Sequence, residues 1–229
     1  AQARDTLPQT DADRAFHLVC DATSLIDYQL PFSPTPEAGE KIITRAHTLL
    51  DEAIALDPRC HDAVRMKAAA TCPTFEDYYD FLLAGVDNVR ADCLAARDAA
   101  IANCSDPATA VMESMLAVRP YVRWLGTIAG RALICGKYRT ALSYVDAALE
   151  IDPNDTGELR FYAYYACAKL EEEELLEKYL LCPNDRAFDD AWLLLSRMSL
   201  AFKRMDFDAA RNCVRLLLKH YPLADITLL

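Results

Sequence analysis

The apolar residues between positions 122 and 155 recur at the spacing of two consecutive helices. The first helix carries large and small apolar residues on one face, at Leu125, Ile128, Ala129 and Ala132. After a turn at residues 136–138, the second helix carries apolar residues at Ala141, Val145 and Ala148, and Pro153 ends it. Small residues let two antiparallel helices approach, while large residues fill the grooves between their ridges. The pattern therefore predicts a helical hairpin.

The same pattern returns twice towards the C-terminus. Ala210 and Pro222 follow Ala141 and Pro153 at equal intervals, close to two repeats of about 34 residues. The last unit carries Leu194, Met198, Ala201, Ala210, Val214 and Leu217. The middle unit carries Leu159, Tyr162, Ala163, Ala166, Leu175 and Tyr179, with an acidic turn at residues 171–174. We therefore predict three consecutive repeats, at residues 122–155, 156–190 and 191–224.

Residues 11–118 are predicted to form less regular helices. Ala46, Leu50, Ala53 and Pro58 match the second helix of a repeat. Prolines at 31, 34 and 36 interrupt the preceding segment, so we expect this helix to pair with one from about Asp11 to Tyr28.

Three further helices are expected before the first clear repeat. A short one covers about residues 61–70, and a longer one runs from a cap at Thr74 towards Ile101. Another should begin at Pro107 and end before Pro120, where the next begins. Because no window alternates like a strand, the fold class is predicted to be all-α.

The order of large and small residues in the hairpins is the tetratricopeptide pattern, with Ala132 in place of an aromatic residue. The RPY segment at residues 119–121, Gly136 and the PNDxGxxR segment ending at Arg160 carry a more specific likeness. With the ALDPRCHDAV segment, they resemble the tetratricopeptide region of the suppression-of-tumorigenicity family and its bacterial relatives, over roughly residues 45–222. The resemblance implies a tetratricopeptide-like helical fold without an assigned catalytic activity. We predict a single domain over residues 1–229, a right-handed superhelix of antiparallel pairs with about nine or ten helices.

The charge of the chain narrows the class of partner. The formal net charge is −11, from 35 acidic and 24 basic side chains. A nucleic-acid binder needs a basic face, and an anionic membrane repels an acidic protein, so we expect neither as a partner. The sequence has no uncharged apolar run of about 18 residues and no basic-then-apolar signal profile at its start. The cysteines, odd in number and irregularly spaced, favour a reducing cytoplasm as the location of the protein.

Cysteine, histidine and acidic residues are present, but not at the spacing of known metal-binding or catalytic motifs. The nine cysteines form no CxxC pair, and Cys60, His61 and Cys72 are the nearest approach to a metal cluster. The four histidines form no HExxH motif, and the segment 130–138 lacks the spacing of a phosphate loop. The acidic run at residues 171–174 is typical of a solvated turn. We therefore predict no catalytic residue, no metal and no cofactor.

A partner protein or peptide is the expected ligand, and an acidic or aromatic segment suits the basic and aromatic residues available. In stacked helix pairs, the first helix of each repeat lines the concave side. The residues predicted to face that groove and bind the partner are Arg123, Arg160, Tyr164, Trp192 and Lys203. Packing of Trp192 between repeats remains an alternative to exposure.

The leading interpretation of function is an interaction scaffold. A regulatory or accessory domain of a larger enzyme or sensor is the alternative, and a stand-alone enzyme comes third. Self-association through exposed end repeats stays open as well, because an unclosed stack of helix pairs needs capping.

Overall fold

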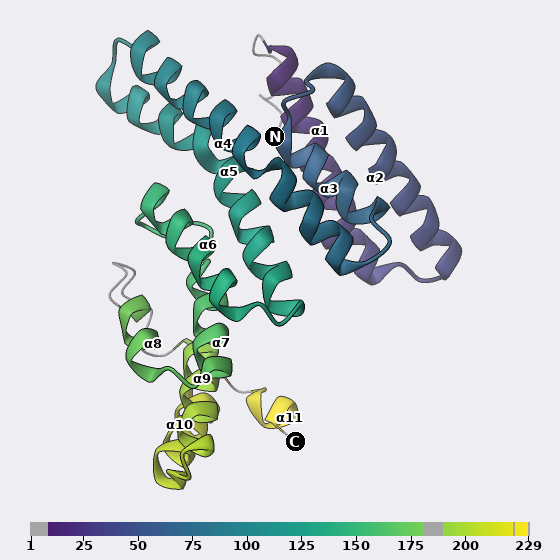
Figure 1. The fold of residues 1–229 in the computed structure, drawn as a ribbon. Coiled ribbons are helices and arrows are strands. Elements are labelled where there is room, and N and C mark those ends of the chain that lie inside the picture. The colour runs from purple at the N-terminus through teal and green to yellow at the C-terminus, as the bar shows by residue number, and fades with distance from the viewer. Residues whose placement is uncertain (1–8, 181–189, 222, 229) are drawn as a thin grey trace. The chain divides into compact units, whose positions relative to one another are not determined.

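The computed structural model describes residues 9–180, 190–221 and 223–228 (Figure 1). This part of the chain contains eleven α-helices and no strand, which confirms the all-α prediction. The number exceeds the nine or ten expected, and α11 (Ala224–Leu228) is a short helix that follows the last predicted repeat.

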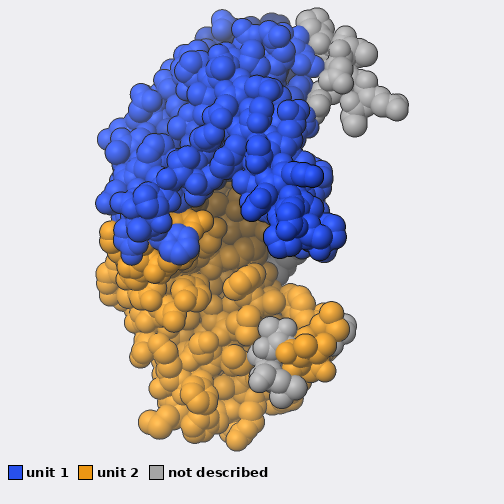
Figure 2. All heavy atoms as spheres, turned by 90° about the vertical axis from the view of Figure 1, so that its right-hand side faces the viewer, with its two compact units in different colours: residues 1–124 blue, residues 125–229 orange. Residues whose placement is uncertain are grey.

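The chain divides into two compact units, Ala1–Trp124 and Leu125–Leu229 (Figure 2). The sequence pattern predicts a single domain, whereas internal contacts gather in two groups whose boundary falls within α5 (Pro107–Ile134). That boundary lies close to Val122, where the first clear repeat is predicted to begin.

The first unit begins with two packed helices, α1 (Asp11–Thr23) and α2 (Pro36–Leu56). A π-helical turn at Ser24–Gln29 and a 3₁₀ turn at Leu30–Phe32 connect them, and Thr35 caps α2. Helix α3 (His61–Thr71) packs on both. Their shared core contains Ala15, Val19, Ala22, Ala46, Leu49, Leu50, Ala53 and Ala63. The predicted pairing across the proline-rich loop is thus confirmed.

A long hairpin of α4 (Phe75–Asn103) and α5 completes the first unit. The predicted cap at Thr74 is present, because the Thr74 Oγ1 atom accepts a hydrogen bond from the Asp77 amide over 3.0 Å. The two helices are tied together where Trp124 Nε1 donates to the Leu82 carbonyl over 2.9 Å. This bond satisfies the buried indole N–H while the ring fills the core.

The predicted helix boundary at Pro120 is wrong, because α5 continues through this residue. Proline inside a helix removes one backbone hydrogen bond and costs about 3 kcal/mol. Side chains on both sides of it are buried, at Val118, Tyr121, Val122 and Trp124. Burial of these apolar side chains stabilises the helix and offsets the missing bond.

The second unit continues from the end of α5 with α6 (Tyr138–Ile151), α7 (Arg160–Leu170) and α8 (Glu173–Leu180). Helices α9 (Ala191–Lys203) and α10 (Phe207–His220) follow. Helix α6 packs on α7, α7 packs on α8 and α9, and α9 packs on α10. The helices of the second unit therefore pack mainly against helices that are one or two places away along the chain.

The first repeat is buried as its pattern predicts. Its apolar positions are almost inaccessible to solvent, at Leu125, Ile128, Ala129, Ala132, Ala141, Val145 and Ala148. Gly136 makes the turn with φ 71°, a conformation that suits glycine, and the Lys137 amide donates to the Ala132 carbonyl over 2.7 Å.

The middle repeat matches the predicted pattern at Leu159, Ala163, Ala166 and Tyr179, which are buried, and departs from it at two positions. Tyr162 is exposed and Leu175 is half-buried, while Tyr164 and Leu176 fill the core. Tyr162 instead covers Gly130, where an added Cβ would lie 3.4 Å from the ring. In the last repeat, Leu194, Ala210 and Leu217 are buried as predicted, whereas Met198, Ala201 and Val214 are only half-buried. The predicted end of that repeat at Pro222, and residues 181–189 of the middle one, lie outside the described residues.

Candidate partner-binding surface

Arg160, expected to face a partner, is instead buried with 4% of its surface exposed. Its Nη1 atom donates to Asp155 Oδ2 over 2.9 Å. The Asp155 carboxylate also accepts the amides of Leu159 at 2.7 Å and Arg160 at 3.3 Å, at the start of α7. Burial raises the pKa of Asp155, although these amides and Arg160 favour its ionised form. The PNDxGxxR segment therefore closes the loop onto α7.

Tyr164 is also buried, with no exposed surface, among the core residues of α7. The prediction that Arg160 and Tyr164 are exposed is thus wrong. Helix α7 begins at Arg160, and the side of it that carries Arg160 and Tyr164 is buried and does not face a groove. A signal was present in the sequence: an aspartate shortly before a helix start often accepts its first amides.

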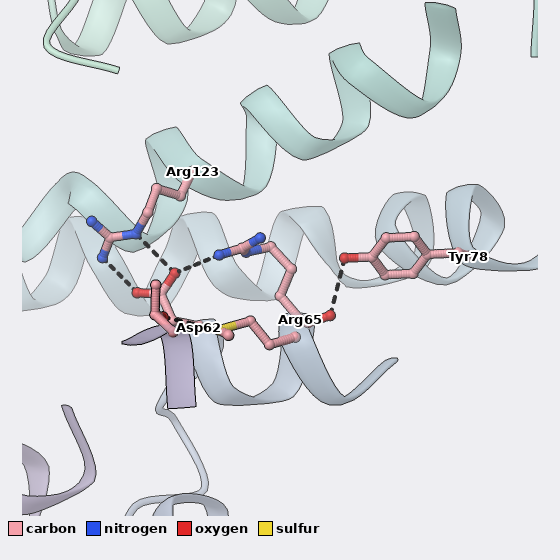
Figure 3. A network of polar contacts seen from close by, with 6 residues as sticks. Asp62, Arg65, Tyr78 and Arg123 are labelled. Atoms are coloured by element: carbon pink, nitrogen blue, oxygen red, sulfur yellow. Dashed lines mark hydrogen bonds and ion pairs between the residues drawn. The ribbon is translucent and has the colours of Figure 1, made fainter. Parts of the chain in front are cut away.

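Arg123 is half-exposed and belongs to a charged network within the first unit (Figure 3). Its Nε donates to Asp62 Oδ1 over 2.9 Å, and its Nη2 donates to Oδ2 of the same carboxylate. Arg65 Nη2 approaches Asp62 Oδ1 at 3.2 Å, and the Arg65 carbonyl accepts from the Tyr78 hydroxyl at 3.0 Å. The network joins α3, α4 and α5, so Arg123 has a structural task.

Electrostatics within this network favour the charged forms. Burial opposes ionisation of Asp62, yet Arg123 and Arg65 outweigh it and lower the pKa of that carboxyl. Burial likewise opposes the charge on Arg123, and Asp62 raises its pKa above the ordinary value. Burial raises the pKa of Cys93 to about 11, so this nearby thiol is protonated at neutral pH and a weak nucleophile.

Trp192 and Lys203 are exposed as predicted, and both lie on α9. Trp192 exposes 55% of its surface at the start of the helix. Lys203 Nζ reaches Glu171 Oε1 at 3.0 Å and donates to the Ala168 carbonyl at 3.3 Å. These contacts hold the C-terminal ends of α7 and α9 together.

Exposed aromatic residues accompany these two on the same pair of helices. Tyr162 and Tyr165 are exposed on α7, and Phe202 is exposed on α9. Lys169 lies over the Tyr165 ring at 5.3 Å, and Phe202 meets Phe207 edge to face at 5.8 Å. We use the term α7–α9 face for the exposed residues of these two helices, Tyr162, Tyr165, Trp192, Phe202 and Lys203. Exposed aromatic side chains such as Tyr and Trp are among the types that anchor partner proteins.

The carboxylates at the acidic turn between α7 and α8 form ion pairs with basic residues. Glu171, Glu172 and Glu173 contact Lys203, Arg139 and Arg204, respectively. Within the described residues, no group of three His, Cys, Asp or Glu side chains is arranged to hold a metal ion. No helix of the described part has the length and apolar character needed to cross a membrane.

Of the five residues predicted to bind a partner, the structure exposes Trp192 and Lys203, which lie at opposite ends of α9. It buries Arg160 and Tyr164 in the core, and it places Arg123 in the first unit. No model of a known protein family matches the chain, and a search of curated proteins gives no significant match.

Proposed function

We propose that this chain is a scaffold of the tetratricopeptide type that binds a partner protein or peptide on the α7–α9 face. The carrying observation is the exposure of four aromatic side chains on two helices that pack against each other. The proposal assigns no reaction and no cofactor to the chain.

The packing order of the second unit supports a tetratricopeptide arrangement. In such a stack, each first helix contacts its own second helix and the first helix of the next repeat. Helix α7 packs on α8 and on α9, as a first helix of a repeat would. Lys178 and Tyr179 of α8 both contact Asp146 of α6, which joins two successive second helices.

The chemistry of the face supports a short peptide segment as the ligand. Tyr, Trp and Arg are the residues whose truncation most often weakens binding strongly, and each aromatic ring offers a large apolar area. Lys169 adds positive charge near the C-terminal end of α7, while the charge of Lys203 at the end of α9 is paired with Glu171. An acidic segment with aromatic residues would match both features.

Selection from a display library of random peptides tests this proposal directly. The full chain serves as bait, and fluorescence anisotropy measures the affinity of the peptides recovered. We expect Trp192→Ala combined with Phe202→Ala to weaken binding by about thirtyfold or more, since truncating one aromatic anchor costs about 2 kcal/mol.

A matched control is available in the first unit. Tyr28 and Phe32 are exposed aromatic residues on the segment between α1 and α2, so Tyr28→Ala with Phe32→Ala removes two exposed aromatic rings elsewhere. Peptides should bind this control as they bind the wild type. The proposal fails if no peptide is enriched, or if both double variants bind equally well.

A further inference from the structure

The outer part of the α4–α5 hairpin has no core of its own. None of the residues from 94 to 117, all of them described, is buried. Figure 1 shows this end of the hairpin projecting away from α1, α2 and α3, which belong to the same unit. Two helices in water without buried apolar contacts are only marginally stable, because most helical stability in proteins comes from packing.

The large apolar side chains of this segment point away from the neighbouring helix. Val111, Met112, Met115 and Leu116 are exposed, the first two by 59% and 57%. Their spacing places them in one stripe along α5. The less exposed positions of α5 here carry small residues, at Ala110, Ser114 and Ala117. We name Val111, Met112, Met115 and Leu116 the α5 stripe.

The charge around the α5 stripe is small. Residues 90–119 carry three arginines and four carboxylates, a net charge of −1, which is close to the chain's average for a segment of this length. Two copies of the chain therefore meet little net charge repulsion where these segments approach each other. Burial of the α5 stripe would stabilise this segment, and a second copy of the chain is present wherever the chain itself is.

We propose that the α5 stripe is a self-association surface on which a second copy of this chain lays its own α5 antiparallel. A two-fold axis between Met112 and Met115 sets these residues opposite each other and Val111 opposite Leu116. The two α4–α5 hairpins then form a four-helix bundle, in which the apolar side chains of both copies are buried.

The same geometry pairs opposite charges at both ends of the stripe. With this axis, Arg119 lies opposite Ala108 of the second copy, within about one helical turn of that copy's Asp106. Arg119 is exposed and forms no ion pair within the described part of the chain. Asp106 is exposed before the start of α5, where its Oδ2 atom accepts hydrogen bonds from Thr109 and Oδ1 lies beside it. The arrangement therefore supplies Arg119 with a carboxylate partner.

Sedimentation of the full chain over about 1 to 100 μM tests the proposal, a range in which dimers of moderate affinity dissociate. The wild type should be a dimer, and Met112→Glu with Leu116→Glu should weaken association by about a hundredfold or more, because it buries charge at the two-fold contact. Tyr28→Glu with Phe32→Glu is the matched control and should leave the dimer unchanged.

Two further measurements guard against a loss of folding. Met112→Ala with Leu116→Ala retains helix-forming residues and should also weaken the dimer, with an unchanged far-ultraviolet circular dichroism spectrum. Hydrogen exchange of amides in residues 94–117 should slow as concentration rises. A wild-type monomer at every concentration overturns the proposal, as does a dimer that survives both α5 double variants. A different protein that covers the stripe would give the first of these results.

Discussion

Arg160 Nη1 lies 2.9 Å from Asp155 Oδ2, and the side chains of this ion pair are only 5% and 1% exposed. The pair joins the loop after α6 to the first turn of α7. A guanidinium that looks suited to a partner's carboxylate is therefore already held by a carboxylate of its own chain.

Removing one member of this pair should destabilise the second unit. Arg160→Ala leaves Asp155 buried without its cation, which typically costs about 3 to 5 kcal/mol. Urea unfolding followed by circular dichroism measures the loss. Arg139→Ala, which breaks an exposed pair with Glu172, is the control and should cost less than about 1 kcal/mol. Equal effects of the two substitutions would contradict a structural role for Arg160.

Stability of the first unit should fall in acid through Asp62. Because its folded pKa lies below its ordinary value, the folded state binds fewer protons than the unfolded state between the two values. Its contribution is thus complete above the ordinary pKa of 3.8 and is lost as pH falls through the lowered one.

Urea unfolding at several pH values from about 5 to 2 measures this loss. A Trp192→Phe background leaves Trp124 as the reporter, because the chain has two tryptophans. Asp62→Asn should flatten the pH dependence. An unchanged slope in that variant would assign the acid sensitivity to other carboxylates.

Gly85→Ala should destabilise the first unit by crowding Trp124. The added Cβ would lie 2.8 Å from Trp124 Cζ2, closer than real contacts allow. The ring has little freedom to move, since its Nε1 is bonded to the Leu82 carbonyl. We expect a cost of about 1 to 3 kcal/mol, measured by denaturant unfolding. The same change in a Trp124→Phe background should cost less, and equal costs would show that the ring is not the obstacle.

Ala141→Glu should lower the thermal stability of the second unit strongly. Ala141 has no exposed surface on α6, so the glutamate would bring a buried charge into a helix contact, at a cost of several kcal/mol. Ser143→Glu places the same side chain on an exposed position of the same helix. Calorimetry should therefore show a lowered transition for the first variant only. A shared transition temperature would refute the burial of Ala141.

The sequence by itself determined the helical class, most helix starts and the buried face of the first repeat. These features depend on neighbours three or four residues apart, so hydrophobic spacing and caps such as Thr74 reveal them. The pairing of α1 with α2 was predictable too. The prolines interrupt the segment directly before α2, so the nearest preceding helix that can pack against it is α1.

Only the tertiary structure decided which charged residues are buried and whether α5 continues through Pro120. Asp62 and Arg123 lie 61 residues apart, and no local pattern connects them. The cost of a proline inside a helix is local, whereas the burial of Trp124 that offsets it depends on Leu82, on another helix. Burial of Arg160 and Tyr164 likewise followed from where α7 begins and what packs on it. The apolar face of a helix is set by residues three or four positions apart. The residues that this face packs against come from distant parts of the chain, so only the tertiary structure identifies them.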